Sequence, residues 1–341
     1  RHRGLARTGC LAQLALAGLA HLICTPMGAG IFFSLAAGMM WGLVFVGPLM
    51  LPEYPAALHT FGRYLAFGLI ALPLALVDRH ELRRLTRPDW LAALRLAAIG
   101  NVLYYLFLAS AIQRAGGALP TMIIGTLPVV IAVSANVLNH QRDGRLAWRQ
   151  LLPALGLILL GIACVNHVEW TALLHQPHAD TGRYISGALL AVGAVVCWTW
   201  YPLKNADWLR GHPERNPRVW ATAQGLATLP LALLGYALFW LWVSVTGDPL
   251  PMPWGPRPQA FVGLMMAIGL FASWLGTLCW NAASQRLPTA LAGQLIVFET
   301  LAALAYAFLL RGQWPEPLTL AGMALLVMGV ISGVRVKAAG H

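Results

Sequence analysis

The sequence has few charged residues for its length, and this scarcity excludes a water-soluble protein. Only 10% of its 341 residues are Asp, Glu, Lys or Arg, and 58% are hydrophobic. A soluble domain carries about a quarter charged residues, which it needs to cover its surface. Apolar runs of about 20 residues, long enough to cross a bilayer, recur along the whole chain. We therefore expect an all-α, polytopic membrane protein.

Signals for other classes of protein are missing as well. The chain lacks the segments of about ten alternating apolar and polar residues that an outer-membrane barrel needs. It has no Walker A loop, which argues against ATP-driven pumping. The five cysteines are odd in number and without metal-ligand spacing, and no HExxH motif occurs. We expect small apolar packing cysteines, no disulfide framework, no metal and no other cofactor.

The positive charge invites comparison with nucleic-acid-binding proteins. The formal net charge is +11. The Arg residues, however, fall in short clusters between apolar runs, which is how orientation in a membrane is encoded. The expected partners are the lipid bilayer and a small-molecule substrate, with no nucleic acid.

Ten membrane spans account for the apolar runs. They cover residues 31–50, 60–77, 91–111, 118–138, 151–168, 184–203, 219–245, 260–282, 288–310 and 318–334. With the N-terminus inside, 18 of the 23 Lys and Arg residues fall on the inner side (23 − 18 = 5 outside). The excess of positive charge inside predicts that both termini are cytoplasmic.

The spans divide into two sets of five. Residues 27–168 form the first set, residues 169–183 an outer linker, and residues 184–341 the second set. A shift of 172 residues places Gln113-Arg114 on Gln285-Arg286 (285 − 113 = 172), which suggests an internal duplication. Because five is odd, the second copy begins on the opposite side of the membrane, and the two copies are inverted repeats around a central cavity. Residues 1–26 are an N-terminal extension that is either signal-like or a short extra helix.

Three segments resemble a known family of transporters. They read AAGMMWGLVF at 36–45, TLPVVIAVSANVL followed by GLILLGIAC within 126–164, and VFETLAALAYAFLL followed by LAGMALLVMGVISG within 297–333. They resemble the EamA family of the drug/metabolite transporter (DMT) superfamily, and within it the YddG-like bacterial aromatic amino acid exporters. The resemblance implies a secondary active transporter of the bacterial inner membrane that exports amino acids, aromatic or other neutral ones, by alternating access.

One carboxylate lies well inside an apolar span, that of Glu299 in the ninth. Ionisable groups at bilayer depth are costly, and they face the protein interior or a water-filled cavity. Glu299 could meet a substrate ammonium or take up a coupling proton, or it could lock its helix to a neighbour through hydrogen bonds. Arg63 lies near the outer end of its predicted span, so we expect its side chain to snorkel to the interface rather than reach Glu299.

A polar and aromatic set within the spans is typical of a cavity for solutes of amino-acid size. Besides Glu299, the candidate pathway residues are Trp41, Asn101, Tyr104, Tyr105, Trp198, Trp274, Thr277, Trp280 and Gln294. The alternative for each is a hydrogen bond between helices or a place in an interfacial aromatic belt. Pro128, in the middle of the fourth span, is a candidate hinge. A GxxxG motif at 329–333 indicates close helix packing more than a dimer contact, so we expect a monomer or weak homodimer.

Other functions stay open at this point. The chain could export drugs or other metabolites instead of amino acids. A membrane-embedded enzyme or receptor is the alternative of a different class. An enzyme needs two or more polar catalytic groups at one depth, and Glu299 alone lies deep within the predicted spans.

Overall fold

The computed structural model describes residues 25–45, 50–115, 118–138, 146–167, 171, 181–312 and 314–335, and its elements are all helical. They are α2 (Pro26–Gly42), η1 (Leu43–Phe45), α4 (Ala56–Val77), α5 (Arg79–Leu82), α6 (Arg87–Leu96), η2 (Ala97–Leu103), α7 (Tyr104–Ala115), α8 (Ala118–Gly125), α9 (Leu127–Leu138), α11 (Trp148–Val165), α13 (Thr181–Gly211), α14 (Pro217–Thr246), α15 (Pro258–Ile268), η3 (Gly269–Leu275), α16 (Gly276–Ser284), α17 (Thr289–Leu295), α18 (Val297–Arg311) and α19 (Pro317–Val334). The predicted extension at 1–26, except for its last two residues, and most of the linker at 169–183 lie outside the described residues.

Among the described residues, eight helices are long and apolar enough to cross a membrane. They match the predicted spans two, three, five, six, seven, eight, nine and ten. The first predicted span appears as α2, which has 17 residues, followed by the short η1. The fourth appears as two shorter helices, α8 and α9, which meet at Thr126. The polytopic helical fold is therefore as predicted, while the count of ten spans stays a prediction.

Local sequence sets the helix ends. Thr25 caps α2 by accepting a hydrogen bond from the Gly28 backbone N–H at 3.0 Å, and Asn216 caps α14 in the same way. A proline follows each cap, at the position where its missing N–H costs nothing. Gly247 ends α14 with φ of 69°, in the left-handed region that glycine adopts without strain.

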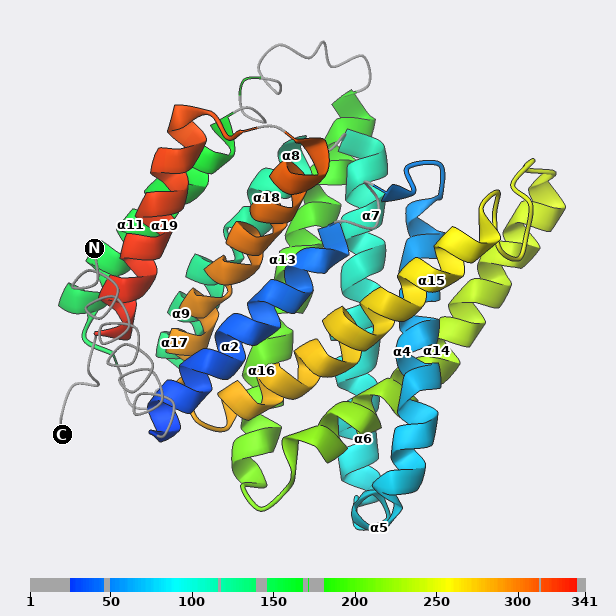
Figure 1. Cartoon of the computed structure of the whole chain (residues 1–341), viewed down its shortest axis with the longest axis horizontal. Helices are drawn as coiled ribbons and strands as arrows, with labels where there is room; N and C mark the ends of the chain where they lie inside the picture. Colours follow the sequence, from blue (N-terminus) through cyan, green and yellow to red (C-terminus); the bar gives the residue numbers. More distant parts are fainter. Residues whose placement is uncertain are drawn as a thin grey trace, which may run out of the picture.

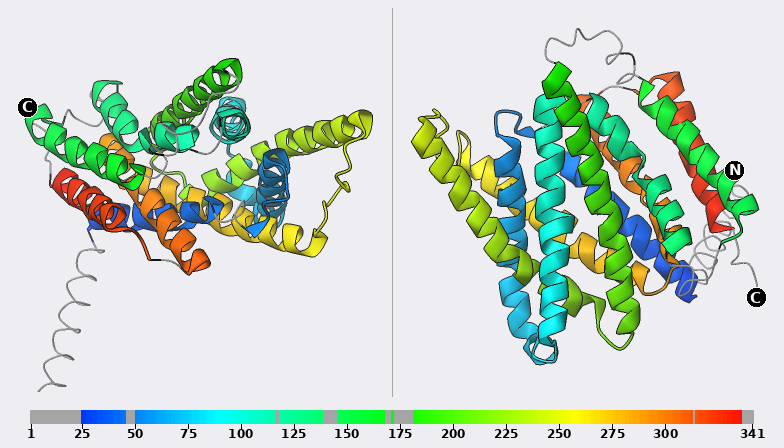
Figure 2. Two further views of the ribbon diagram at one scale, coloured as in Figure 1. Left: turned by 90° about the horizontal axis from the view of Figure 1, so that it is seen from above. Right: turned by 180° about the vertical axis from the view of Figure 1, so that it is seen from behind.

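The helices pack in pairs from distant parts of the chain. In Figures 1 and 2, α11 lies beside α19 at one end of the molecule, and α4 lies beside α14 near the other. A Cβ added to Gly322 would come 2.8 Å from the Gly161 backbone oxygen, so the two glycines let α11 and α19 approach closely. Gly329 of the GxxxG motif faces Ala154 and Ile158 of α11 in the same chain. The motif therefore serves close packing within the chain.

Two of the spans contain a wide, π-helical segment. They are η2 in the third predicted span and η3 in the eighth. Their first residues are Ala97 and Gly269, and their separation equals the repeat shift found in the sequence (269 − 97 = 172). The fourth and ninth spans are both broken, at Thr126 and at Ile296, within two residues of that shift (296 − 126 = 170). Irregular turns of this kind inside helices are frequent at functional sites.

Candidate functional site: a charged and aromatic central cavity

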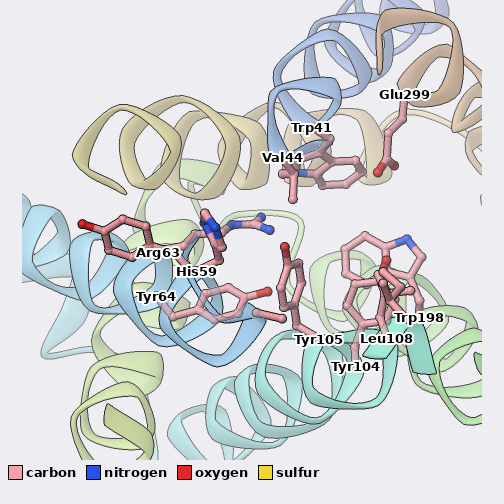
Figure 3. Close-up of a pocket in the computed structure, with 13 residues that line it drawn as sticks. Trp41, Val44, His59, Arg63, Tyr64, Tyr104, Tyr105, Leu108, Trp198 and Glu299 are labelled. Carbon is pink, nitrogen blue, oxygen red and sulfur yellow. The ribbon is translucent and has the colours of Figure 1, made fainter. Parts of the chain in front are cut away.

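A cavity of about 260 Å³ lies between α2, α4, α7, α13 and α18 (Figure 3). Its lining residues are Trp41, Val44, Tyr54, Ala56, His59, Arg63, Tyr64, Tyr104, Tyr105, Leu108, Ile112, Trp198 and Glu299. The first three turns of α4 contribute to its wall, so the cavity lies towards the end of the bundle where α4 begins. Both predicted halves of the chain contribute to it.

Glu299 reaches the cavity from the first turn of α18. The turn starts there because the ninth span is broken at Ile296, which the sequence did not predict. The Glu299 side chain is half-buried, and within the described part of the chain its carboxylate makes no ion pair and no hydrogen bond. A carboxylate that locked two helices together would be hydrogen-bonded to a neighbour, so this geometry favours a role in the cavity.

Arg63 lines the same cavity as Glu299, and the prediction that it snorkels to the interface was wrong. Helix α4 begins at Ala56, four residues before the predicted start at residue 60, so Arg63 lies one turn deeper than expected. Its Nε donates a hydrogen bond to Ser273 Oγ at 2.9 Å. Its guanidinium also lies over the Tyr64 ring, 5.0 Å from the ring centroid.

Aromatic rings form one continuous wall between the two charged residues. Tyr64 contacts Tyr105 edge-on, with ring centroids 6.5 Å apart, and Tyr105 contacts Tyr104 at 6.3 Å. Tyr104 stacks on Trp198 at 4.9 Å, and Trp198 meets Trp41 edge-on at 5.5 Å. A wall of this kind offers π faces to a cation and apolar surface to a hydrocarbon group.

Two rim residues were missed in the sequence. His59 is buried, and its Nε2 lies 3.1 Å from the Leu51 carbonyl oxygen, while its Nδ1 has no partner among the described atoms. Tyr54 donates a hydrogen bond to the Trp254 carbonyl and accepts one from the Arg257 backbone N–H. His59 and Arg63 are four residues apart and so share one face of α4, which is the signal that could have identified them together.

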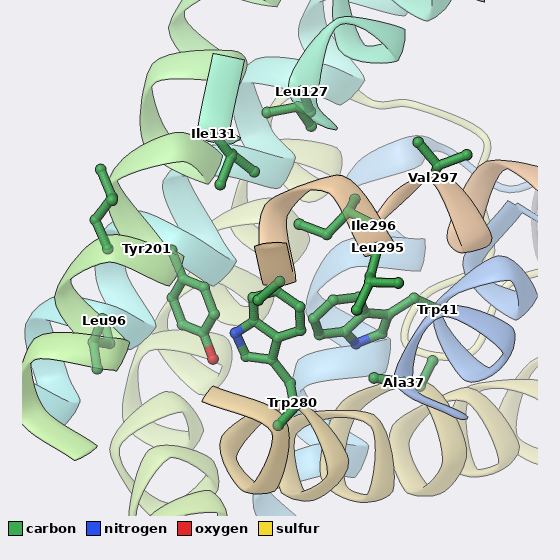
Figure 4. Packing of buried hydrophobic residues seen from close by; sticks show 14 of the residues in the cluster. Ala37, Trp41, Leu96, Leu127, Ile131, Tyr201, Trp280, Leu295, Ile296 and Val297 are labelled. Carbon is green, nitrogen blue, oxygen red and sulfur yellow. The ribbon is translucent and has the colours of Figure 1, made fainter. Parts of the chain in front are cut away.

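The cavity floor is a packed aromatic layer (Figure 4). Trp41 lies against Trp280, with ring centroids 5.2 Å apart, and Trp198 stacks on Tyr201 at 5.1 Å. Trp280 is 1% exposed and Tyr201 2%, so these two rings are closely packed among the described residues.

Beneath this floor, Asn205 organises a buried hydrogen-bond cluster. Its Oδ1 accepts from Trp220 Nε1 at 2.9 Å and from Gln224 Nε2 at 3.0 Å, and its Nδ2 donates to Asn281 Oδ1 at 2.9 Å. The Tyr201 hydroxyl donates to Gln224 Oε1 at 2.8 Å. These bonds join α13, α14 and α16 and close the end of the bundle opposite the cavity.

Five predicted pathway residues do not line this cavity. Asn101 donates to Thr228 Oγ1 at 3.3 Å, and Trp274 donates to Thr222 Oγ1 at 3.3 Å, so both join neighbouring helices. Gln294 is fully buried and donates to the Ala290 carbonyl of its own helix. Thr277 and Trp280 are buried in α16 away from the lining. Glu299, Trp41, Tyr104, Tyr105 and Trp198 are the predicted residues that the structure brings together.

A second cavity, also of about 260 Å³, lies on the other side of Glu299 between α7, α8, α9, α11 and α18. Glu299, Leu108 and Ile112 line both cavities, so the two are neighbours. Most of its other residues are apolar, among them Ile124, Leu127 and Ala307. Pro128 also lines it, as the second residue of α9, and the helix break lies two residues earlier, at Thr126. Whether Pro128 acts as a hinge stays a prediction.

Metal chemistry has no visible site in the described part of the chain, where no three His, Cys, Asp or Glu residues gather closely enough to hold an ion. Cys164, Cys197 and Cys279 are free thiols within the helices.

A helical bundle with a central charged cavity defines a polytopic membrane protein, and the family that the chain matches consists of membrane transporters. The chain belongs to the EamA-like transporter family, whose pattern matches residues 28–167. It is 57% identical over 311 residues to the "Inner membrane protein YtfF" of Escherichia coli (strain K12), covering 91% of this chain and 96% of that protein. It is 24% identical to the "Uncharacterized transporter YwfM" of Bacillus subtilis (strain 168), covering 88% and 91% of the two chains. A solved structure with 19% identity shares the fold, with a TM-score of 0.68 over 90% of this chain and 97% of the other.

Proposed function

We propose that the protein is a secondary active transporter that exports amino acids, aromatic or other neutral ones, and related small metabolites across the bacterial inner membrane. The observation that carries this proposal is the unpaired Glu299 carboxylate in an aromatic cavity between the two halves of the chain. An intramembrane acid without a protein partner marks a substrate or ion pathway. Membership of a transporter family favours transport over an enzyme or a receptor. The direction of export rests on the resemblance to amino acid exporters.

Packing supports two repeats related by a two-fold axis. The shift of 172 residues carries α4 onto most of α14 and α11 onto most of α19, and the helices of each pair contact each other. It carries α7 onto α16 and α2 onto the second half of α13; α7 packs on α13, and α16 packs on α2. A two-fold axis that exchanges α7 with α16 and α2 with α13 turns the contact between α7 and α13 into the contact between α16 and α2, so both contacts are required together. With five spans per repeat, the axis lies in the membrane plane and the repeats are inverted.

Charge supports an outward-facing arrangement. The closed end of the bundle carries basic residues, including Arg79, Arg84, Arg210 and Arg215, and the excess of positive charge in a membrane protein faces the cytoplasm. Both termini are then cytoplasmic, and the cavity lies in the outer half. Alternating access requires the Asn205 cluster to open while the rim around Tyr54 and His59 closes.

Flux in proteoliposomes tests the proposal. Vesicles containing the wild-type chain and loaded with unlabelled neutral amino acids should accumulate a labelled one by exchange, and vesicles without protein should not. Glu299→Gln should lower the exchange at least about tenfold, because it removes the one charge that meets the substrate ammonium or coupling proton. Glu316→Gln, at an exposed helix start, is the matched control and should behave as wild type.

Two results would narrow or end the proposal. Exchange of drugs or other metabolites with no exchange of any amino acid would leave a transporter of a different substrate class. Normal exchange in Glu299→Gln would remove this residue from the mechanism while leaving the transporter intact.

A further inference from the structure

Two opposite charges, those of Arg63 and Glu299, line one cavity and attract each other across it without forming a direct ion pair. The Arg63 guanidinium and the Glu299 carboxylate point into the cavity from different walls (Figure 3). Neither forms an ion pair within the described part of the chain. Charges taken out of water are costly unless they are paired, so each is available for a ligand of the opposite sign.

We propose that this cavity binds a zwitterion at two points, with the substrate carboxylate on Arg63 and the substrate ammonium at Glu299. The inference rests on the proposed function and specifies the substrate class: α-amino acids with both charged groups free. Under it, Arg63 is a substrate-binding residue, which nothing in the sequence pattern assigned.

The contacts of Arg63 prepare it to bind a carboxylate. Its Nε is held by Ser273 Oγ at 2.9 Å, and its guanidinium lies over the rings of Tyr64 and Tyr105, 5.0 Å and 6.0 Å from their centroids. These contacts fix the plane of the guanidinium and leave both Nη groups without a described hydrogen-bond partner. Two parallel N–H donors are the geometry that pairs with both oxygens of a carboxylate.

The surroundings of Glu299 suit an ammonium group. Trp41, Tyr104 and Trp198 line the cavity together with Glu299, and π faces attract cations. The apolar part of a bound amino acid would face Leu108 and Ile112, beyond which the second, apolar cavity begins. The lining therefore favours neutral amino acids with apolar or aromatic side chains.

Removing one charge of the substrate at a time tests the two contacts separately. Three unlabelled compounds would compete with labelled phenylalanine for binding to the purified full-length chain. They are phenylalanine itself, phenethylamine, which lacks the carboxylate, and 3-phenylpropionate, which lacks the ammonium. Leucine, 3-methylbutylamine and 4-methylpentanoate form a second series. Wild type should bind each amino acid at least about thirtyfold more tightly than its two analogues.

Substitutions in the protein should then match the substitutions in the ligand. Arg63→Gln should weaken the binding of phenylalanine at least about thirtyfold and leave the affinity for phenethylamine nearly unchanged, because the amine has no group for Arg63 to bind. Glu299→Gln should weaken the binding of phenylalanine and leave the affinity for 3-phenylpropionate nearly unchanged. Arg114→Gln and Glu316→Gln, which remove exposed charges, are the controls. Arg63→Lys keeps the charge but loses the planar pair of donors and should fall between wild type and Arg63→Gln.

The outcomes separate the inference from the proposed function. Size-exclusion chromatography would first show that the Arg63→Gln variant is folded. The inference fails if this variant binds phenylalanine and phenethylamine more weakly than wild type by the same factor, or if the wild type binds the amine as tightly as the amino acid. Transport of amino acids with either result would keep the proposed function. Failure of the wild type to bind or exchange any amino acid would overturn both.

Discussion

Gly38 of α2 touches the backbone of Glu299 so closely that a Cβ atom at position 38 would lie 3.0 Å from the Glu299 nitrogen and 3.1 Å from Phe298 Cβ. Both neighbours belong to the first turn of α18, and neither a backbone nitrogen nor a Cβ atom bonded directly to the backbone can move aside as the end of a flexible side chain can. The absence of a side chain at Gly38 therefore sets how near α2 comes to the carboxylate that lines the cavity.

Gly38→Ala should destabilise the protein by about 1–3 kcal/mol, because the added methyl overpacks the contact between α2 and α18. Gly156→Ala is the matched control, since a Cβ at position 156 meets no atom within 4 Å. There, alanine should be neutral or stabilising by up to about 1 kcal/mol through its higher helix propensity. Thermal unfolding in detergent would measure both, and equal effects at the two positions would contradict the close contact.

Ser273→Ala should raise the KM for a neutral amino acid about tenfold and leave the maximal rate of transport nearly unchanged. The serine hydroxyl holds the Arg63 Nε, and a hydrogen bond to a charged group contributes about 1.5–3 kcal/mol. Initial rates of exchange at varied substrate concentration would show the split between KM and rate. Ser244→Ala, on the exposed side of α14, should change neither quantity. A lower maximal rate at unchanged KM would show that Ser273 does not act through binding.

Asn205→Leu should lower the free energy of unfolding by about 2–4 kcal/mol, because it leaves Trp220 Nε1 and Gln224 Nε2 buried without an acceptor. Asn101→Leu loses one longer bond, to Thr228, at a half-buried position, and should cost about 1 kcal/mol. Chemical unfolding in detergent would compare the two variants. If both lose the same stability, the closed end of the bundle is not held by the Asn205 cluster.

A cysteine at position 254 should react with a membrane-impermeant maleimide added to intact cells, and one at position 214 should not. Trp254 is exposed between α14 and α15, at the end of the bundle nearest the cavity, and Glu214 is exposed in the basic connection between α13 and α14. Trp254→Cys and Glu214→Cys would be made in a chain whose five native cysteines are replaced by alanine. Labelling at 214 alone would reverse the orientation assigned from charge.

How much of the site the sequence predicts depends on whether a residue stands out by itself. Glu299 does, as the lone acid deep in an apolar run, and so do the aromatic residues Trp41, Tyr104 and Trp198. Arg63 was misjudged because its depth was measured from a helix start at residue 60, whereas α4 begins at Ala56. An error of one helical turn changes a residue from the membrane interface to the cavity wall.

Asn101 shows a different reason for failure. Its spacing from Tyr104 and Tyr105 predicts a shared face only in an α-helix, and Asn101 lies in the π-helical segment η2. The wider turn directs its side chain to Thr228 of α14. In the same way, an α-helix would place Ser273 and Asn281 on one face of the eighth span, but they contact Arg63 and Asn205 at separate places. Composition gives no signal for a π-helical turn, because the turn depends on packing between helices.

The extra residue in η2 also fixes the rotational phase of everything that follows it in the third span. Successive residues of an α-helix are about 100° apart around the axis. Deleting one residue between Ala97 and Leu103 would turn the downstream helix by that angle and swing Tyr105, Leu108 and Ile112 out of the cavity wall. A substitution along this helix changes one side chain of the wall, whereas any change in the length of η2 would turn all the wall residues that follow it at once.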